Sequence, residues 1–258
     1  MIKLTDIYFK REERTIIKGI NLQVKPAEQW VILGRNGSGK TTLLEMINGY
    51  LFPSSGKVEV MGNLYGTVDL REVRKKIGYI SQSLFEKLNL GDPVWEVVAT
   101  GEYGFLRFYQ TIPQEVIDKA EEMLNFVGLS HVAKQPLGTL SQGERKKVML
   151  ARSLMTEPSI LILDEPCAGL DLYEREKLLE NIDQLAGRGI TTIYVTHHVE
   201  EIMPLYTHVV LIDQGETVAS GPKKEVLTAE NLGRAFGITL SLEWNRERPW
   251  IKVLDNHF

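Results

Sequence analysis

The stretch Gly34–Thr41, GRNGSGKT, restricts the fold of this chain more than any other. A short apolar run, Trp30–Leu33, comes before it, and a helical pattern starts near Lys40. The local order is therefore strand, glycine loop and helix, and the pattern G-x-x-x-x-G-K-[ST] is typical of loops that cradle nucleotide phosphates. Gly37 and Gly39 let the backbone turn its N–H groups toward phosphate oxygens, where a side chain would block the approach.

Lys40 and Thr41, which end this loop, suggest how the negative charge of the phosphates is balanced. Lys40 offers a positive charge to the β- and γ-phosphates, and the hydroxyl of Thr41 can join the coordination shell of Mg²⁺. The start of the helix points its positive end at the same anion. We therefore predict a nucleotide site here. The residues expected to form it are Gly34, Arg35, Asn36, Gly37, Ser38, Gly39, Lys40, Thr41 and Thr42.

Strand signals alternate with helical signals along most of the chain, which predicts an α/β fold with a largely parallel sheet covered on both faces. The expected strands are Ile16–Val24, Trp30–Leu33, Lys57–Met61, Ile77–Ile80, Ile160–Leu163, Thr191–Thr196 and Val209–Ile212. The expected helices include Gln114–Val127, Glu174–Ala186 and Val199–Met203. Between about residues 84 and 158 the signals are mostly helical, as for an insertion into the core. Ile238–Phe258 fits either a small strand or a mobile tail.

Composition narrows the class of protein. With 258 residues, 43 % of them hydrophobic, the chain can bury one substantial core. A formal charge of −4 argues against a nucleic-acid protein held by phosphate contacts. The single cysteine excludes an intrachain disulfide framework and a cysteine-based zinc cluster. The N-terminal residues lack the apolar core of a signal peptide, and no apolar stretch is long enough for a spanning helix. We expect a soluble protein of a reducing compartment that reaches a membrane only through a partner.

A second acidic motif, ILILDEP, follows as Ile160–Pro166. Asp164 ends an apolar strand and would hold Mg²⁺, directly or through water. Glu165 would polarise a water molecule aimed at the γ-phosphate. Two solvated acids at a strand end are a common alternative. The phosphate loop favours the functional interpretation, because parallel strands present ligands at this edge.

The turn Ser141–Glu144 allows two interpretations. Ser141 and Glu144 have the spacing of a capping box, which satisfies the N–H groups at a helix start. No cap requires the intervening pair Gln142-Gly143. The turn is therefore either only a helix beginning, or its N–H groups form half of an anion site.

From Leu4 to about Gly237 the order of these motifs resembles the nucleotide-binding subunit of the ABC transporter family. GRNGSGKT matches the family's Walker A motif and ILILDEP its Walker B motif. The remaining matches are Gln82 at the Q-loop, Leu140–Glu144 at the signature motif, Ala168–Asp171 at the D-loop and His197 at the switch histidine.

The resemblance implies a RecA-like P-loop core with a mostly parallel sheet, an N-terminal antiparallel β part and an inserted helical subdomain. It implies one ABC ATPase domain over residues 1–258. Residues 1–83 and 159–237 would form the ATP-binding core, 84–158 the helical subdomain and 238–258 a C-terminal extension.

The resemblance also implies roles for single residues. Gln82 would contact Mg²⁺ and water, together with Thr41 and Asp164 as metal ligands. Glu165 and His197 would be catalytic, with His197 at the γ-phosphate. Ser141 and Gly143 would cap the γ-phosphate bound to a second subunit, so that two ATP molecules lie between two chains.

Three residues depart from the family pattern. Gln142 replaces a glycine of the signature motif, and Glu144 replaces its glutamine, bringing a negative charge near phosphate. The aromatic residue that stacks on adenine aligns with Arg11, which could stack through its guanidinium. Tyr8 or Phe9 could take its place after a shift.

The resulting expectation is an ATP-hydrolysing subunit, peripheral on the inner face of the cell membrane. Its partners would be transmembrane permease subunits and a second nucleotide-binding subunit, most simply as a homodimer. A weaker similarity points to importers of chelated iron, cobalamin or molybdate. The alternative is a soluble ABC ATPase acting on a cytosolic assembly such as an iron–sulfur scaffold. A nucleotide kinase or GTPase is disfavoured, because no NKxD-type motif is present.

The aromatic stretch Glu102–Tyr109 allows two interpretations. It either fills the core of the helical part itself or contacts a helix of a partner protein.

Overall fold

Strands and helices alternate through most of the computed structural model, which describes residues 1–185 and 187–254. The described chain divides into two compact units. The first unit combines Met1–Arg74 with Gly189–Phe258, and the second is Lys75–Arg188. Each unit has its own strands and helices, and each is described by itself.

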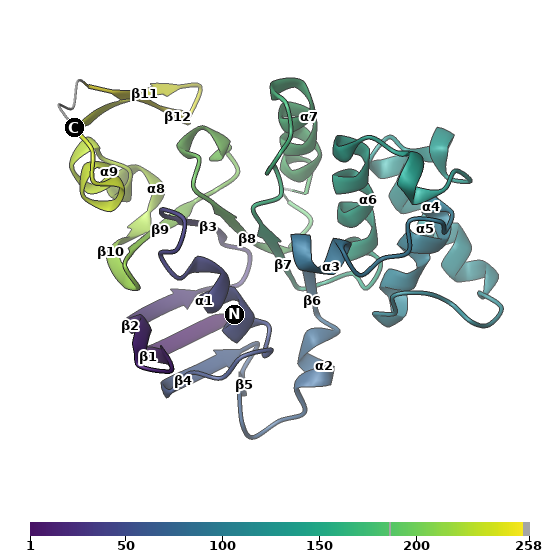
Figure 1. The fold of residues 1–258 in the computed structure, drawn as a ribbon, viewed down its shortest axis with the longest axis horizontal. Helices are drawn as coiled ribbons and strands as arrows, with labels where there is room; N and C mark the ends of the chain where they lie inside the picture. The colour runs from purple at the N-terminus through teal and green to yellow at the C-terminus, as the bar shows by residue number, and fades with distance from the viewer. Residues whose placement is uncertain (186, 255–258) are drawn as a thin grey trace. The chain divides into compact units, whose positions relative to one another are not determined.

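The first unit begins with an antiparallel sheet in the order β2-β1-β4-β5 (Figure 1). Its strands are β1 Ile2–Arg11, β2 Arg14–Val24, β4 Ser55–Val60 and β5 Asn63–Leu64. In β1 the buried positions shift by one residue between Leu4 and Ile7, where the pairing register also shifts. Asp6 has a φ of 47° at this bulge, which keeps apolar side chains on the buried face on both sides of it.

The same unit contains the parallel strands that carry the phosphate loop. β3 (Gln29–Leu33) pairs in parallel with β8 (Thr191–Thr196) and with β9 (His208–Asp213). β10 (Glu216–Pro222) pairs antiparallel with β9. The apolar side chains of β3 are at most 4 % exposed, and burying each one contributes roughly 1.5–3 kcal/mol. The helices that follow these strands or lie beside them are α1 Lys40–Ile47, α2 Leu70–Arg74 and the 3₁₀ helix η4 Val199–Glu201.

The C-terminal part of the first unit consists of two helices and a hairpin. These elements are α8 Lys223–Val226, α9 Ala229–Phe236, β11 Leu240–Asn245 and β12 Arg248–Val253. β11 and β12 pair antiparallel, so the strand alternative predicted for this segment is the one observed, as a hairpin that ends at Val253. Residues 255–258 lie outside the described part.

The second unit is mostly helical around one pair of parallel strands, β6 (Ile77–Ile80) and β7 (Ile160–Asp164). Its α-helices are α3 Gln82–Phe85, α4 Val94–Ala99, α5 Gln114–Phe126, α6 Gln142–Leu154 and α7 Leu172–Asp183. Its 3₁₀ helices are η1 Thr100–Tyr103, η2 Ser130–Val132 and η3 Leu137–Thr139. The buried Arg152 of α6 donates to Thr100 Oγ1 at 3.1 Å and to the carbonyl of Phe105 at 2.7 Å, which ties the loop after η1 to the helices.

None of the helices in residues 1–185 and 187–254 has both the length and the apolar character needed to span a bilayer.

Candidate functional site

The phosphate loop connects β3 to α1 in the first unit. Gly37 and Gly39 have φ values of 79° and 104°, in the left-handed region that glycine adopts without steric cost. Gly34 is required for another reason, because an added Cβ would lie 2.1 Å from the carbonyl oxygen of Ile212. The fold itself therefore demands the glycines of the motif.

Three features of the loop fit bound phosphates. Lys40 is buried, and its Nζ donates to the carbonyl oxygens of Gly34 at 2.9 Å and Arg35 at 3.0 Å, so its charge stays at the loop. α1 has no side-chain N-cap and no acid in its first turn, which leaves its positive end without a competing side-chain acceptor. The hydroxyl of Ser38 is buried and has no hydrogen-bond partner among the described residues. A phosphate oxygen would satisfy it.

A pocket of about 410 Å³ opens beside the loop within the same unit. Its walls are Arg14–Ile16 and Lys18 of β2, residues 35–38 of the loop, Asp213 at the end of β9 and Gln214 after it. The position and the mainly polar and cationic lining suit the remainder of a nucleotide whose phosphates lie on the loop.

The three residues considered for base stacking lie elsewhere. Arg11 is exposed at the end of β1 and is not among the residues that line the pocket. Phe9 is 8 % exposed and belongs to the core. The hydroxyl of Tyr8 lies against Gly19, 2.9 Å from where a Cβ would be placed on that glycine. The sequence did not indicate that the start of β2 would face the loop.

In each unit, the register of a parallel strand pair places predicted site residues at the same edge of the sheet. In the first unit Leu33 of β3 is opposite Thr196 of β8, so the phosphate loop and His197 leave the parallel strands at the same edge. In the second unit Ile80 of β6 is opposite Leu163 of β7, so Gln82 and Asp164 also follow strand ends that lie side by side. Carboxyl edges of parallel strands are where such folds bind ligands.

The two acids after β7 differ in backbone conformation. Asp164 is the last strand residue and is half-buried. Glu165 has a φ of 46°, an unusual left-handed conformation for a non-glycine residue. The regular strand backbone therefore stops at Asp164, and Glu165 begins the loop that follows.

Lys146 of α6 was not identified from the sequence as a residue of this site. Burial lowers the pKa of the Lys146 ammonium, and electrostatic interactions with Cys167, Asp164 and Glu165 offset part of that effect. The ammonium of Lys146, on the helix α6 that follows the signature motif, therefore lies near the carboxylates of Asp164 and Glu165 within one unit. Its spacing in the sequence gave no signal of this, because the contact depends on how α6 packs.

The capping box predicted at Ser141 is confirmed. Its Oγ accepts from the N–H of Glu144 at 3.2 Å, and the carboxylate of Glu144 accepts from the N–H of Ser141 at 2.8 Å. Glu144 is thus turned back to its own helix start. Gln142 Nε2 donates to the carbonyl of Ala168 at 3.5 Å, which directs that side chain toward the residues after β7.

Gly143 has a packing role that the motif alone does not reveal. It is buried, and an added Cβ would lie 2.1 Å from Oε2 of Glu174 on α7. Glu174 also forms an ion pair with Lys147 of α6 at 3.7 Å. Glycine at this position therefore leaves room for the carboxylate of Glu174 against the start of α6.

The remaining predicted residues lie at element ends. Gln82 is the first residue of α3 and donates to Glu86 at 3.3 Å. Asp171 caps α7 by accepting from the N–H of Glu174 at 2.9 Å. The ring of His197 lies 4.1 Å from the ring of His198, measured between centroids.

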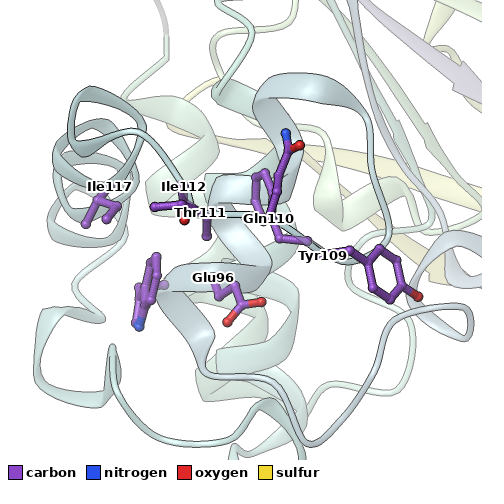
Figure 2. Close-up of a pocket in the computed structure, with 8 residues that line it drawn as sticks. Glu96, Tyr109, Gln110, Thr111, Ile112 and Ile117 are labelled. Atoms are coloured by element: carbon purple, nitrogen blue, oxygen red, sulfur yellow. The ribbon is translucent and has the colours of Figure 1, made fainter.

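The second unit has a separate hollow on its surface, with a volume of about 610 Å³. Figure 2 shows Glu96 of α4 and Ile117 of α5 at this hollow, with Tyr109, Gln110 and Thr111 on the connecting loop. Burial raises the pKa of the Glu96 carboxyl, and the charge of Asp92 adds to that shift. Tyr109 is 91 % exposed.

The aromatic stretch before this hollow is divided between core and surface. Phe108 is 7 % exposed, and its ring meets the rings of Tyr103 and Phe105 edge-on at 5.9 and 6.0 Å. Tyr109 points outward in Figure 2. Phe108 therefore belongs to the core of the helical part, whereas Tyr109 is left on its surface.

Comparison with known proteins gives consistent results. A family model described as ABC transporter matches residues 17–168. The ABC transporter ATP-binding protein YlmA of Bacillus subtilis (strain 168) is 40 % identical over 254 residues, covering 97 % of this chain and 96 % of the relative.

Two solved structures are also similar. CbiO1 of Clostridium perfringens, part of the ABC transporter complex cbiONQ, has a TM-score of 0.78 at 29 % identity, covering 90 % of this chain and 92 % of its own. The ATP-binding cassette MJ0796, in a dimeric post-hydrolysis state with ADP and Pi, has a TM-score of 0.75 at 26 % identity. The match covers 86 % of this chain and 98 % of that structure's chain. These similarities confirm the expected α/β fold with a RecA-like P-loop core.

Proposed function

The chain belongs to the ABC transporter family of ATP-binding proteins, which hydrolyse ATP, and from that premise we propose that it powers a membrane transporter by nucleotide-driven closure of a dimer. The observation that carries the proposal is the phosphate loop. It combines an uncapped helix start, a buried lysine and a buried Ser38 hydroxyl without a partner among the described residues.

ATP binding is the first part of the proposal. Its phosphates lie on the N–H groups of residues 34–42, with Lys40 against the β- and γ-phosphates. Thr41, Gln82 and Asp164 offer hydroxyl, amide and carboxylate oxygens, the hard donors that Mg²⁺ prefers. When bound, Mg²⁺ supplies positive charge to the phosphate oxygens.

Hydrolysis needs a base and a group that holds the γ-phosphate. We assign Glu165 as the base that accepts a proton from the attacking water. His197, which leaves the sheet beside the phosphate loop, donates to the γ-phosphate. Lys146 keeps a positive charge near Asp164 and Glu165 from the signature helix.

The second half of the phosphate site comes from another copy of the chain. Ser141 and the N–H of Gly143 lie at the positive end of α6, where an anion is favoured. The carboxylate of Glu144 is engaged with its own cap, so it need not oppose the phosphate. Closing on two ATP molecules would bring this turn onto the partner's γ-phosphate, and hydrolysis would release it.

Coupling to transport needs a permease partner, and the hollow at Glu96 is the surface we assign to it. It presents an exposed tyrosine, Tyr109, and apolar walls from Ile112 and Ile117. Glu96 adds a carboxylate inside the hollow. A cytoplasmic helix of a membrane protein with one basic residue opposite Glu96 fits this chemistry. The chain would then be peripheral on the inner face of the membrane.

The experiment is to purify the affinity-tagged chain from solubilised membranes of its own host and to identify what accompanies it by mass spectrometry. We expect a polytopic membrane protein in fixed proportion. Glu96→Lys and Tyr109→Ala should each lose that protein while binding ATP normally. Tyr50→Ala, which removes another largely exposed tyrosine, is the matched control and should retain it. Recovery of the chain from the cytosolic fraction alone, bound to a soluble scaffold, would contradict the proposal.

A further inference from the structure

We propose that Arg14, rather than an aromatic residue, contacts the base of the bound nucleotide, and that the site therefore accepts adenine and guanine nucleotides with similar affinity. The inference rests on the proposed nucleotide site and adds the residue that meets the base.

The start of β2 is fastened to the phosphate loop. Lys18 donates its N–H to the carbonyl of Gly215 at 2.8 Å, and Gly215 in turn donates to the carbonyl of Ser38 at 3.0 Å. Cδ1 of Ile17 lies 2.6 Å from the position that a Cβ on Gly39 would occupy, so β2 also packs against the loop. A nucleoside attached to phosphates on the loop therefore extends into the pocket that β2 bounds.

The pocket offers the base a cation instead of a ring. None of the residues that line it is aromatic, among the residues that the structure describes. Lys18 is held by an ion pair with Glu216 at 3.2 Å. Arg14 forms no hydrogen bond or ion pair with any described side chain, so its planar guanidinium is available. A guanidinium plane stacks on the face of a nucleobase.

Arg11 is less well placed than Arg14. In the strand order β2-β1-β4-β5, β1 lies on the side of β2 away from β10, which packs beside β2. Arg11 and Arg14 are opposite one another in the register, so they share a face of the sheet, but only Arg14 lines the pocket. Arg14, which begins the next strand, therefore suits contact with the base better than Arg11, the residue expected from the family resemblance.

Stacking through a guanidinium makes little distinction between bases, because every base has a π face. Ile16 adds only aliphatic surface to the same wall. The carboxylate of Asp213 can accept from an amino group, which adenine and guanine both carry. Neither Ile16 nor Asp213 therefore distinguishes one purine from the other.

The test measures equilibrium binding of ATP, GTP and inorganic tripolyphosphate by calorimetry, in the Glu165→Gln background so that nucleotide is not consumed. The variants are Arg14→Ala, Arg14→Lys and Arg11→Ala, each checked for folding by thermal melting. We expect ATP and GTP to bind the parent with Kd values within about fivefold. Arg14→Ala should weaken both by roughly 5- to 100-fold, as for the loss of one stacked base.

Tripolyphosphate separates contact with the base from contact with phosphate. Its Kd should change less than about twofold in Arg14→Ala, and Arg14→Lys should not restore nucleotide binding, since lysine keeps the charge but not the plane. Equal weakening of tripolyphosphate, a larger effect of Arg11→Ala on ATP, or a strong preference for ATP over GTP in the parent would each overturn the inference. If the parent binds neither ATP nor tripolyphosphate, the proposed function itself fails.

Discussion

At the scale of single residues, Glu165 shows how the backbone prepares the proposed chemistry. Its φ of 46° is a conformation that costs a non-glycine residue about 1 kcal/mol or more. The strand before it is fully buried up to Leu163, which holds the position firmly. Asp164 thus ends the strand while Glu165 begins the loop, and we assign the two acids different roles.

The first prediction concerns this residue. Glu165→Gln should bind ATP within about threefold of the parent, because no phosphate contact is removed, while steady-state phosphate release falls by at least ~100-fold with the loss of a general base. Glu180→Gln, on the exposed part of α7, is the control and should leave the rate unchanged. Normal turnover in Glu165→Gln would show that another group takes the proton.

Gly143 shows why a motif residue can be a poor target for substitution. Replacing it with any larger residue would place a Cβ against the carboxylate of Glu174. A loss of activity in Gly143→Asp would then reflect displacement of the Glu174 side chain as well as any effect on phosphate. Ser141 avoids this problem, because its hydroxyl accepts a hydrogen bond from its own helix start.

At the scale of elements, much of the fold follows from periodicity. Ile77–Ile80 and Thr191–Thr196 are strands with the same bounds as predicted, because they are short apolar runs with clear ends. The predicted helix Val199–Met203 is instead a 3₁₀ helix that ends at Glu201. Its buried carboxylate accepts from Tyr194 at 2.9 Å and from Thr196 at 2.6 Å, a tertiary contact that holds the tight turn.

The candidate site was predictable to the extent that it consists of loops at strand ends. The phosphate loop and the acids after β7 are local sequence patterns with a direct chemical meaning. Arg14, Lys146 and Glu174 were not predictable, because each reaches its place through packing between elements distant in the sequence. Periodicity reports which face of an element is buried but not which element covers it.

The capping box of α6 gives the second prediction. Ser141→Ala should lower the free energy of unfolding by about 1 kcal/mol, the usual cost of a lost N-cap. It should also impair hydrolysis while ATP binding by the isolated monomer stays nearly unchanged. Thr228→Ala removes the equivalent cap of α9 and is the matched control. It should destabilise the chain by a similar amount while ATP turnover stays normal. If Ser141→Ala abolishes binding by the monomer, the turn serves its own chain's nucleotide.

Tyr65 links α1 to the segment after β5 and gives a prediction about pH. Its hydroxyl donates to the carbonyl of Ile47 at 2.5 Å, and burial raises the pKa of Tyr65 to about 12, with Arg74 opposing the shift. Because the folded state favours the neutral phenol, this stabilisation is complete below pH ~10 and is lost as the pH rises toward 12.

Tyr65→Phe should therefore be less stable than the parent at pH 7 by about 1 kcal/mol, the value of one hydrogen bond. The difference should narrow between pH 10 and 11.5, where the parent loses stability more steeply. Urea unfolding at several pH values measures both effects. Tyr109→Phe changes a tyrosine that is 91 % exposed and should follow the parent throughout. A constant difference at all pH values would show that Tyr65 titrates normally.

At the scale of the whole molecule, the proposed reaction depends on two chains. The phosphate loop and His197 belong to one compact unit, and the signature turn, Asp164 and Glu165 belong to the other. Each unit supplies anion-binding or carboxylate groups at the edge of parallel strands or at a helix start. In the proposed dimer, the signature turn of each copy completes the phosphate site of its partner.

Measuring the mass of the Glu165→Gln chain in solution, by light scattering on a sizing column, tests this account most directly. With ATP and Mg²⁺ the mass should rise from 29.3 kDa to about twice that value, with two ATP molecules per pair. ADP, or the additional change Ser141→Ala, should leave the chain at 29.3 kDa. A chain that stays at this mass with saturating ATP, and whose unmodified form hydrolyses ATP at the same rate per molecule at every concentration, would contradict the account.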